Sequence, residues 1–312
     1  MSEPGSVTTC AFVHEGLFYR GTDAYLAGTV PFIEDGLSAG EPVLVAVPAA
    51  NLELIRAGLN GAGQRVRFAD MAWAGRNPGR IIPWVLHAFI SEHPGRRPRI
   101  IGEPIWPERS ADEYPACAQH EALINEAFAG ADATILCPYD AERLSPRALA
   151  DALVTHPVMV DEGRRYASVE YAPLDLVAAY NRPLPEPTEP VTALPFTFET
   201  LAVLRQFAAE HATRAGLPAN RVDDLEIAVN ELATNTICYG GGAGTLRIWQ
   251  SDGLFACEVH DRGRITDPLA GRLPPPLTGE SGRGLVIVHH VCDLVRVHTD
   301  ATGTTVRLFM YR

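Results

Sequence analysis

The chain lacks a long apolar run. None of its 312 residues belongs to a stretch of roughly 18 consecutive apolar side chains, the length that a membrane-spanning helix needs. Its first residues also lack the basic start followed by an apolar segment that marks a secretion signal. We therefore expect a cytoplasmic protein with no membrane association.

The chain also lacks clusters of basic residues and of cysteines. The formal net charge is -12 and no run is rich in lysine or arginine, which argues against a nucleic-acid partner. The 6 cysteines are scattered and form no Cys-x-x-Cys pair. The spacing therefore predicts neither a disulfide framework nor a zinc knuckle.

Apolar residues make up 46% of the chain, which is long enough to form two domains with separate cores. Residues 181–190 contain four prolines, which remove backbone donors and favour a stiff, extended spacer. We therefore predict an N-terminal domain at residues 8–178, a linker at 179–195 and a C-terminal domain at 196–312.

The N-terminal half alternates short apolar runs with helical patterns. This alternation predicts an α/β domain with a mainly parallel sheet covered by helices. No glycine-rich phosphate-binding motif occurs in this half. The expected strands are Val43–Val47, Arg65–Phe68, Ile100–Gly102 and Ala133–Cys137, and the expected helices are Thr22–Ala39, Asn51–Leu59, Gly79–Glu92 and Ala111–Ala129.

Polar side chains collect where the expected strands of this half end, an edge at which open parallel sheets usually bind ligands. One interpretation is a small-molecule or metal pocket. The other is strand-end capping with buried structural histidines, because no pair shows the spacing of metal ligands. The candidate pocket residues are His14, Glu103, His120, Glu121, Cys137 and His156.

Several strings in this half resemble one family. They are Gly102-Glu-Pro-Ile-Trp106, His120-Glu-Ala-Leu-Ile-Asn125, Leu136-Cys-Pro-Tyr-Asp140 and Thr155-His-Pro157, with His14 and Tyr19 before them. Together they resemble the MEDS sensory domain over roughly residues 8 to 175. The resemblance implies a RecA-like or KaiC-like α/β core without a phosphate loop, acting as a signal-input module for an unknown small organic compound.

In the C-terminal half, residues 223–235 have the pattern of an amphipathic helix. Leu225, Val229 and Leu232 share one face, and Glu231 and Asn235 lie one turn apart on the neighbouring stripe. A carboxylate in this position can act as a general base, and a carboxamide oxygen can bind Mg²⁺. Such a pair is also common on solvated helix faces.

Further polar signals follow in a fixed order. A predicted hairpin, Thr245–Gln250 and Leu254–His260, ends in Asp261-Arg262-Gly263, where a carboxylate could accept a purine amine proton. The proline-rich residues 264–280 predict a cover loop. Gly282-Arg283-Gly284 then opens an apolar helix, and the free N–H groups at such a helix start bind phosphates. A second hairpin, Leu294–Thr299 and Thr305–Met310, is predicted to close the chain.

This order resembles the GHKL (Bergerat) ATP-binding fold, an α+β sandwich. More narrowly, Ala228-Val-Asn-Glu-Leu-Ala-Thr-Asn235 and Gly282-Arg-Gly-Leu285 resemble RsbW-type anti-sigma-factor serine kinases over residues 193–312. The resemblance implies that Glu231 is the catalytic base, Asn235 the Mg²⁺ ligand and Asp261 the adenine-recognising carboxylate. It assigns the nucleotide loops to Gly263, Gly282, Arg283 and Gly284, and the adenine pocket also to Thr305.

One position departs from this family. Ile265 stands where the adenine loop often has a second glycine, and we expect its side chain to narrow the mouth of the site or to alter the cover loop.

The two resemblances together imply a sensory domain that controls an ATP- and Mg²⁺-dependent protein serine/threonine kinase. Its expected partner is a STAS-type anti-anti-sigma factor, a sigma factor or both. A second hypothesis is a GHKL binding module that acts only by sequestering such partners. A third is an enzyme centred on the N-terminal domain, which would need a metal or cofactor. The sequence leaves the oligomeric state open, a homodimer included.

Overall fold

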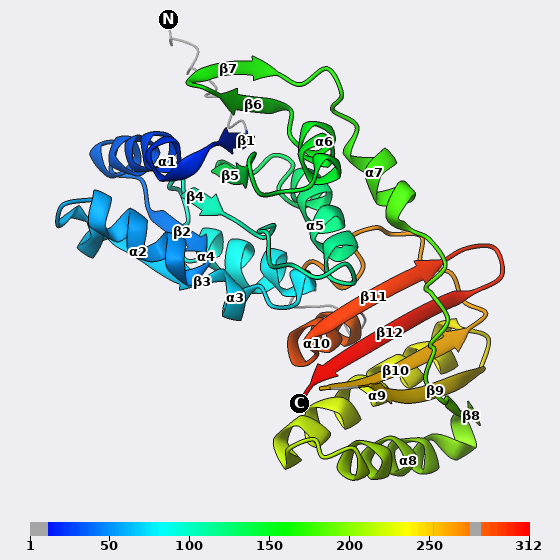
Figure 1. Ribbon diagram of the computed structural model, residues 1–312. Helices are drawn as coiled ribbons and strands as arrows, with labels where there is room; N and C mark the ends of the chain where they lie inside the picture. The colour runs from blue at the N-terminus through cyan, green and yellow to red at the C-terminus, as the bar shows by residue number, and fades with distance from the viewer. Residues whose placement is uncertain (1–11, 252, 275–281) are drawn as a thin grey trace, which may run out of the picture.

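The computed structural model has two domains, each built from one β-sheet and the helices that cover it (Figure 1). The structure describes residues 12–251, 253–274 and 282–312. Among these residues, none of the helices combines the length and the apolar character that crossing a membrane requires.

The N-terminal sheet has seven strands in the order β3-β2-β4-β5-β1-β6-β7. All neighbours run parallel except β6 and β7, which form an antiparallel pair. The expected mainly parallel sheet is therefore confirmed. Its strands are β1 (Val13–Tyr19), β2 (Val43–Val47), β3 (Val66–Asp70), β4 (Arg99–Gly102), β5 (Thr134–Asp140), β6 (Val158–Asp161) and β7 (Arg164–Ala167).

Helices cover both faces of this sheet, because its central strands carry apolar side chains on both sides. Leu44 and Ile135 pack toward α4, α5 and α6, whereas Val45 and Leu136 pack toward α1 and α2. Such strands are typical of a parallel sheet between two helical layers. The α-helices of this domain are α1 (Gly21–Ser38), α2 (Ala49–Gly58), α3 (Met71–Ala74), α4 (His87–Ser91), α5 (Tyr114–Ala127), α6 (Pro146–Thr155) and α7 (Pro173–Tyr180).

The helix expected at Gly79–Glu92 is irregular. A 3₁₀ turn, Pro78–Arg80, leads into a π-helical segment, Ile81–Leu86, before α4 begins. Pro83 lies inside the π-helical segment, and a proline there cannot donate a backbone hydrogen bond. The continuous helix that the apolar pattern predicted is therefore wrong in detail.

The C-terminal sheet has five antiparallel strands in the order β11-β12-β10-β9-β8. Three helices cover one of its faces, with Leu204, Val229 and Val288 packed against inward-facing strand residues such as Cys257 and Leu308. This is the expected α+β sandwich of the GHKL fold. Its elements are β8 (Thr192–Thr197), α8 (Leu201–Arg214), α9 (Ala219–Tyr239), β9 (Ala243–Ser251), β10 (Leu254–Asp261), α10 (Arg283–Val291), β11 (Leu294–Thr299) and β12 (Thr304–Tyr311).

The opposite face of this sheet lies against the first domain. Trp249, Leu294 and Phe309 form a small apolar cluster with Ala116 of α5. The Arg296 guanidinium also donates to the Asp112 carbonyl at 2.7 Å. β8 begins at Thr192, so the last residues of the range expected to be a linker form an edge strand of the second sheet.

Candidate functional site

The stripe of α9 that carries Glu231 and Asn235 faces the start of α10. A methyl group on Gly284 would lie 2.7 Å from Glu231 Oε2 and 3.4 Å from Asn235 Nδ2. Only a residue without a side chain lets the first turn of α10 approach these two groups so closely. The structure therefore brings together the carboxylate, the carboxamide and the glycine-opened helix.

The start of α10 has backbone N–H groups that the helix itself leaves without an acceptor. Gly282 precedes the helix with a φ of 94°, a left-handed conformation that favours glycine. The first N–H groups of a helix have no intrahelical acceptor, and the helix dipole makes this end positive. Arg283 is exposed at this point. Because the chain contains no lysine, the groups that suit an anion here are the arginine side chain and these neutral backbone amides.

Asp261 lies beside the last turn of α9, which begins directly after Asn235. Its Oδ2 accepts a hydrogen bond of 2.7 Å from the Thr236 hydroxyl, and its Oδ1 accepts one of 2.7 Å from the Gly263 N–H. A methyl group on Gly240 would lie 2.6 Å from Asp261 Oδ2. The carboxylate is thus held in one orientation, and each oxygen retains a lone pair for a further donor.

The sequence predicted Thr305 beside this carboxylate, but the structure places Thr304 there. β10 and β12 pair Asp261 with Thr304 and His260 with Thr305. Side chains alternate between the two faces of a strand. Thr305 therefore lies on the other face, where its hydroxyl is 3.0 Å from His260 Nδ1. Thr304 donates instead to the Gly263 carbonyl at 2.9 Å.

Ile265 has a defined place in the loop after Asp261. Its N–H donates to Thr299 Oγ1 at 3.1 Å, and Thr299 Oγ1 lies 2.8 Å from Thr304 Oγ1. The segment that replaces the second glycine is thus tied to β11. The last part of the predicted cover loop, residues 275–280, lies outside the described residues.

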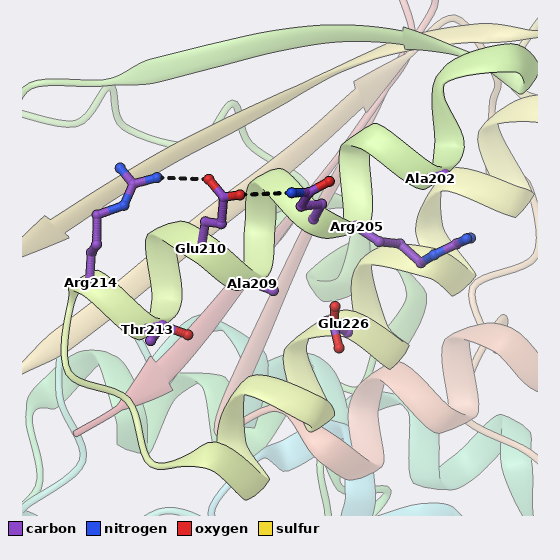
Figure 2. A pocket seen from close by; sticks show the side chains of 8 residues that line it. Ala202, Arg205, Ala209, Glu210, Thr213, Arg214 and Glu226 are labelled. Carbon is purple, nitrogen blue, oxygen red and sulfur yellow. Dashed lines mark hydrogen bonds and ion pairs between the residues drawn. The ribbon is translucent and has the colours of Figure 1, made fainter.

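Two surface hollows of the protein lie away from these residues. Figure 2 shows the first, a cavity of about 630 Å³ between α8 and α9, where Glu210 pairs with Arg214 and Glu226 lies across from α8. The second, of about 540 Å³, lies between the domains and is lined by Trp106 and Arg296 among others. Neither hollow is lined by Glu231, Asn235 or Asp261.

In the first domain, four of the six predicted pocket residues converge. The ligand atoms of His14, Glu121, Cys137 and His156 all lie within 4.8 Å of one another, and all four residues are buried. His120 is not part of this group. Burial lowers its pKa to about 3, and its Nδ1 has no hydrogen-bond partner in the described part of the chain.

Glu103 belongs to a separate buried cluster at the end of β4. Its carboxyl group accepts hydrogen bonds from Tyr19, Tyr25 and Asn51, at 3.3, 3.2 and 2.8 Å. Burial raises the pKa of Glu103 to about 8, and these donors only partly offset that effect. Burial therefore favours the protonated form of Glu103.

The far end of α10 is anchored in the first domain. Asn77 is fully buried and donates to the carbonyls of His289 and Cys292, at 2.8 and 3.4 Å. The Trp84 ring lies 4.5 Å from the His290 ring, and Gly79 leaves no room for a side chain beside His289. α10 thus connects the candidate catalytic residues to the other domain.

The loop that follows Asp261 also reaches the first domain. Leu269 and Leu273 pack against the apolar core that includes Cys117 and Ile124 of α5. Arg272 is buried there, and burial lowers its pKa to about 10.

Sequence reasoning did not assign a role to several residues that hold these sites in place. Thr236 lies among the buried apolar residues of α9, where a polar side chain is a signal that it has a partner. Thr304 and Asn125 gave no comparable signal, because their partners are distant in the sequence.

Comparisons with protein families agree with both halves of this architecture. Residues 13–157 match the family model described as MEDS, MEthanogen/methylotroph, DcmR Sensory domain. Residues 194–310 match the model of the histidine kinase-like ATPase domain. The protein thus joins an input module to a nucleotide-binding module. The chain consists of a MEDS sensory domain followed by a GHKL-type, histidine kinase-like ATPase domain.

Similar solved structures cover only part of the chain. The RsbU and RsbW domains of Rv1364c from Mycobacterium tuberculosis match 38% of this chain and 32% of that one, with 18% identity and a TM-score of 0.30. The histidine kinase AdeS from Acinetobacter baumannii matches 38% of this chain and 67% of its own, with 15% identity and a TM-score of 0.23. None of the curated proteins matches the chain.

Proposed function

We propose that this protein is a signal-controlled protein serine/threonine kinase of the anti-sigma type. In this proposal the C-terminal domain transfers the γ-phosphoryl group of ATP to a STAS-type anti-anti-sigma partner, and the same surface holds a sigma factor. The observation that supports it most is the convergence of Glu231, Asn235 and the start of α10, with Asp261 beside the next turn of α9.

Each residue has a role that its position supports. The Glu231 carboxylate accepts the proton of the partner's hydroxyl, and the backbone N–H groups at the start of α10 hold the phosphates. The Asp261 carboxylate accepts the exocyclic amine proton of adenine. Asn235 provides a side-chain oxygen for Mg²⁺, which when bound neutralises phosphate charge during the transfer.

Control by the sensory domain is supported by the contacts of α10 and of residues 264–274. Both segments border the proposed nucleotide site at one end and pack into the first domain at the other. A small-molecule signal that binds two arrangements of the first domain with different affinity would therefore change the nucleotide site.

Nucleotide binding is tested by calorimetric titration of the full chain with Mg-ATP. Asp261→Asn keeps the shape but removes the charge, and hydrogen bonds to charged groups contribute about 1.5–3 kcal/mol. We expect the dissociation constant to rise about 10- to 150-fold, with no change for Asp23→Asn, an exposed aspartate of α1. Equal affinities for the wild type and Asp261→Asn would rule out the adenine role.

Phosphoryl transfer is tested with labelled ATP and recombinant STAS-domain proteins as acceptors. Removal of a general base slows such reactions about 10²- to 10⁴-fold, which is the loss we expect for Glu231→Gln. Glu226→Gln is the matched control, because Glu226 is on the same helix but lines the hollow of Figure 2. Tight Mg-ATP binding without transfer by the wild type would replace the kinase proposal with sequestration alone.

A further inference from the structure

The four buried side chains that converge in the sensory domain come from four different elements. His14 is on β1, Glu121 on α5, Cys137 on β5 and His156 directly after α6. His156 Nε2 lies 3.1 Å from Glu121 Oε2, and His14 Nε2 lies 3.4 Å from the same oxygen and 3.4 Å from Cys137 Sγ.

These atoms are close together, but several of them have no hydrogen-bond partner in the part of the chain that the structure describes. Within the described residues, both Glu121 oxygens and His156 Nε2 have no hydrogen-bond partner, although they are fully enclosed. A buried carboxylate with no hydrogen bond is rare, because its desolvation is uncompensated. A positive charge shared by these atoms would compensate this desolvation cost.

The hydrogen bonds around the cluster fix the orientation of both imidazoles. Asn125 Nδ2 donates to the Ala122 and Thr155 carbonyls, at 3.2 and 2.8 Å, so its Oδ1 must be the atom that faces His14 Nδ1 at 3.1 Å. His14 Nδ1 is therefore protonated, and in the neutral ring its Nε2 carries the lone pair.

The same argument applies to His156. Its Nδ1 lies 2.9 Å from the Ala152 carbonyl, which can only accept, so Nδ1 is protonated and Nε2 carries the lone pair of the neutral ring. When both rings are neutral, their Nε2 lone pairs face the Glu121 carboxylate, an arrangement that is repulsive unless a proton or a metal cation lies between them. Outer hydrogen bonds that fix the tautomer in this way are typical of metal-binding histidines.

Glycine supplies the space that one of these rings occupies. A methyl group on Gly16 of β1 would lie 3.2 Å from His156 Cγ and 2.7 Å from Met159 Sδ. The central strand thus accommodates His156 between β1 and α5.

We infer that His14, Glu121, Cys137 and His156 bind one divalent transition-metal ion of the zinc class. Two neutral imidazoles, a carboxylate and a thiolate carry two negative charges together, which a divalent ion balances inside the protein. Zinc bond lengths place tetrahedral ligand atoms about 3.3–3.7 Å apart, close to the separations observed. A thiolate and two imidazoles favour zinc over Mg²⁺ or Ca²⁺, which prefer oxygen ligands.

Four protein ligands make a closed site, which is the pattern of structural rather than catalytic zinc. The ion would join β1, β5, α5 and the end of α6. This inference does not depend on the proposed kinase activity, because none of the four residues belongs to the C-terminal domain.

The test uses the full chain purified without a metal-affinity tag, stripped with a chelator and then dialysed with Zn²⁺. Elemental analysis should find one Zn²⁺ per chain. Co²⁺ in its place should give the visible bands of a tetrahedral ion and a thiolate-to-cobalt charge-transfer band. Cys137→Ser should lose that band, whereas Cys117→Ser, a buried cysteine outside the cluster, should keep it.

Glu121→Gln should weaken Zn²⁺ binding at least tenfold, because it removes a charged ligand and even changes to groups around the ligands cost this much. Glu103→Gln, a second buried carboxyl group, should leave it unchanged. If the cluster variants do not fold, the wild-type protein still provides a test, since Zn²⁺ should raise its Tm and a chelator should reverse the rise. A wild-type chain that retains no Zn²⁺ and shows no such rise, or a Cys117→Ser variant that loses the cobalt band, would overturn the inference.

Discussion

The carboxyl group of Glu103 should make the stability of the protein depend on pH. Glu103 is 1% exposed, and its neighbours are the hydroxyl groups of Tyr19 and Tyr25, the Asn51 amide and the Asp140 carboxylate. Burial raises its pKa from 4.5 to about 8. The folded protein therefore holds this proton more tightly than the unfolded chain, so stability is lost as pH rises from about 4.5 toward 8.

The expected slope is about 1.4 kcal/mol per pH unit, the value for one proton held in the folded state alone. From pH 6.5 to pH 8 the loss is about 1.6 kcal/mol, because the slope falls to half its full value as the pH reaches the pKa of about 8. Buried histidines lower the stability as the pH falls, and they do so in a lower pH range than Glu103. Burial lowers the pKa of His14, His120 and His289, so these residues reduce the folding stability only as the pH falls below about 6.5. Between pH 6.5 and 8, Glu103 should dominate.

The assay is urea unfolding of the wild type and Glu103→Gln at several pH values in this interval. The substitution changes the hydrogen bonds to Tyr19, Tyr25 and Asn51 by a constant amount, whereas the slope reports only the proton. Glu103→Gln should lose the slope, and Glu53→Gln, with a side chain that is 73% exposed, should keep it. Identical slopes for the wild type and Glu103→Gln would refute the assignment.

Two further predictions concern α10. Gly284→Ala places a methyl group 2.7 Å from Glu231 Oε2, so we expect at least a tenfold loss of phosphoryl transfer, measured with labelled ATP, while thermal unfolding stays cooperative. Unchanged transfer would mean that Glu231 is not held against α10 during the reaction. Asn77→Ala leaves the carbonyls of His289 and Cys292 without this donor, and we expect a loss of about 1–3 kcal/mol in urea unfolding. A loss below about 0.5 kcal/mol would show that water replaces the amide.

The regular parts of the fold could be predicted from the sequence because their residues satisfy local rules. β2 reads Val-Leu-Val-Ala-Val and is fully buried, and α9 carries its apolar residues at helical spacing. β1 was not predicted, although it lies between β5 and β6. Its polar residues are satisfied only by distant partners, as His14 is by Asn125 and Glu15 by Arg165. A local sequence pattern cannot identify partners that are so far away in the chain.

The two candidate sites differ in the same way. Glu231 and Asn235 are one helical turn apart, so local spacing was enough to place them on one stripe. The metal-ligand cluster draws on positions 14, 121, 137 and 156, and only the strand order brings them together. The resemblance assigned Thr305 to the adenine pocket, and the sequence does not give the register of β12. The pairing of Asp261 with Thr304 decides which threonine faces the nucleotide site.

Control of one domain by the other requires an element that both domains contact and that moves as a unit. α10 meets this requirement, because its 9 residues span only about 13 Å and a short helix transmits displacement along its axis. Its first turn packs against Glu231, and its last turn accepts hydrogen bonds from Asn77. A shift of the segment around Asn77 by a fraction of an ångström would therefore change the Gly284–Glu231 contact directly. α5 adds a second route, since Glu121 lies among the metal ligands while Cys117, one turn earlier, lies in the core that receives Leu269 and Leu273. A ligand in the sensory domain could then act on both the phosphate end of the site and its covering loop, with a strength limited by its difference in affinity for the two arrangements.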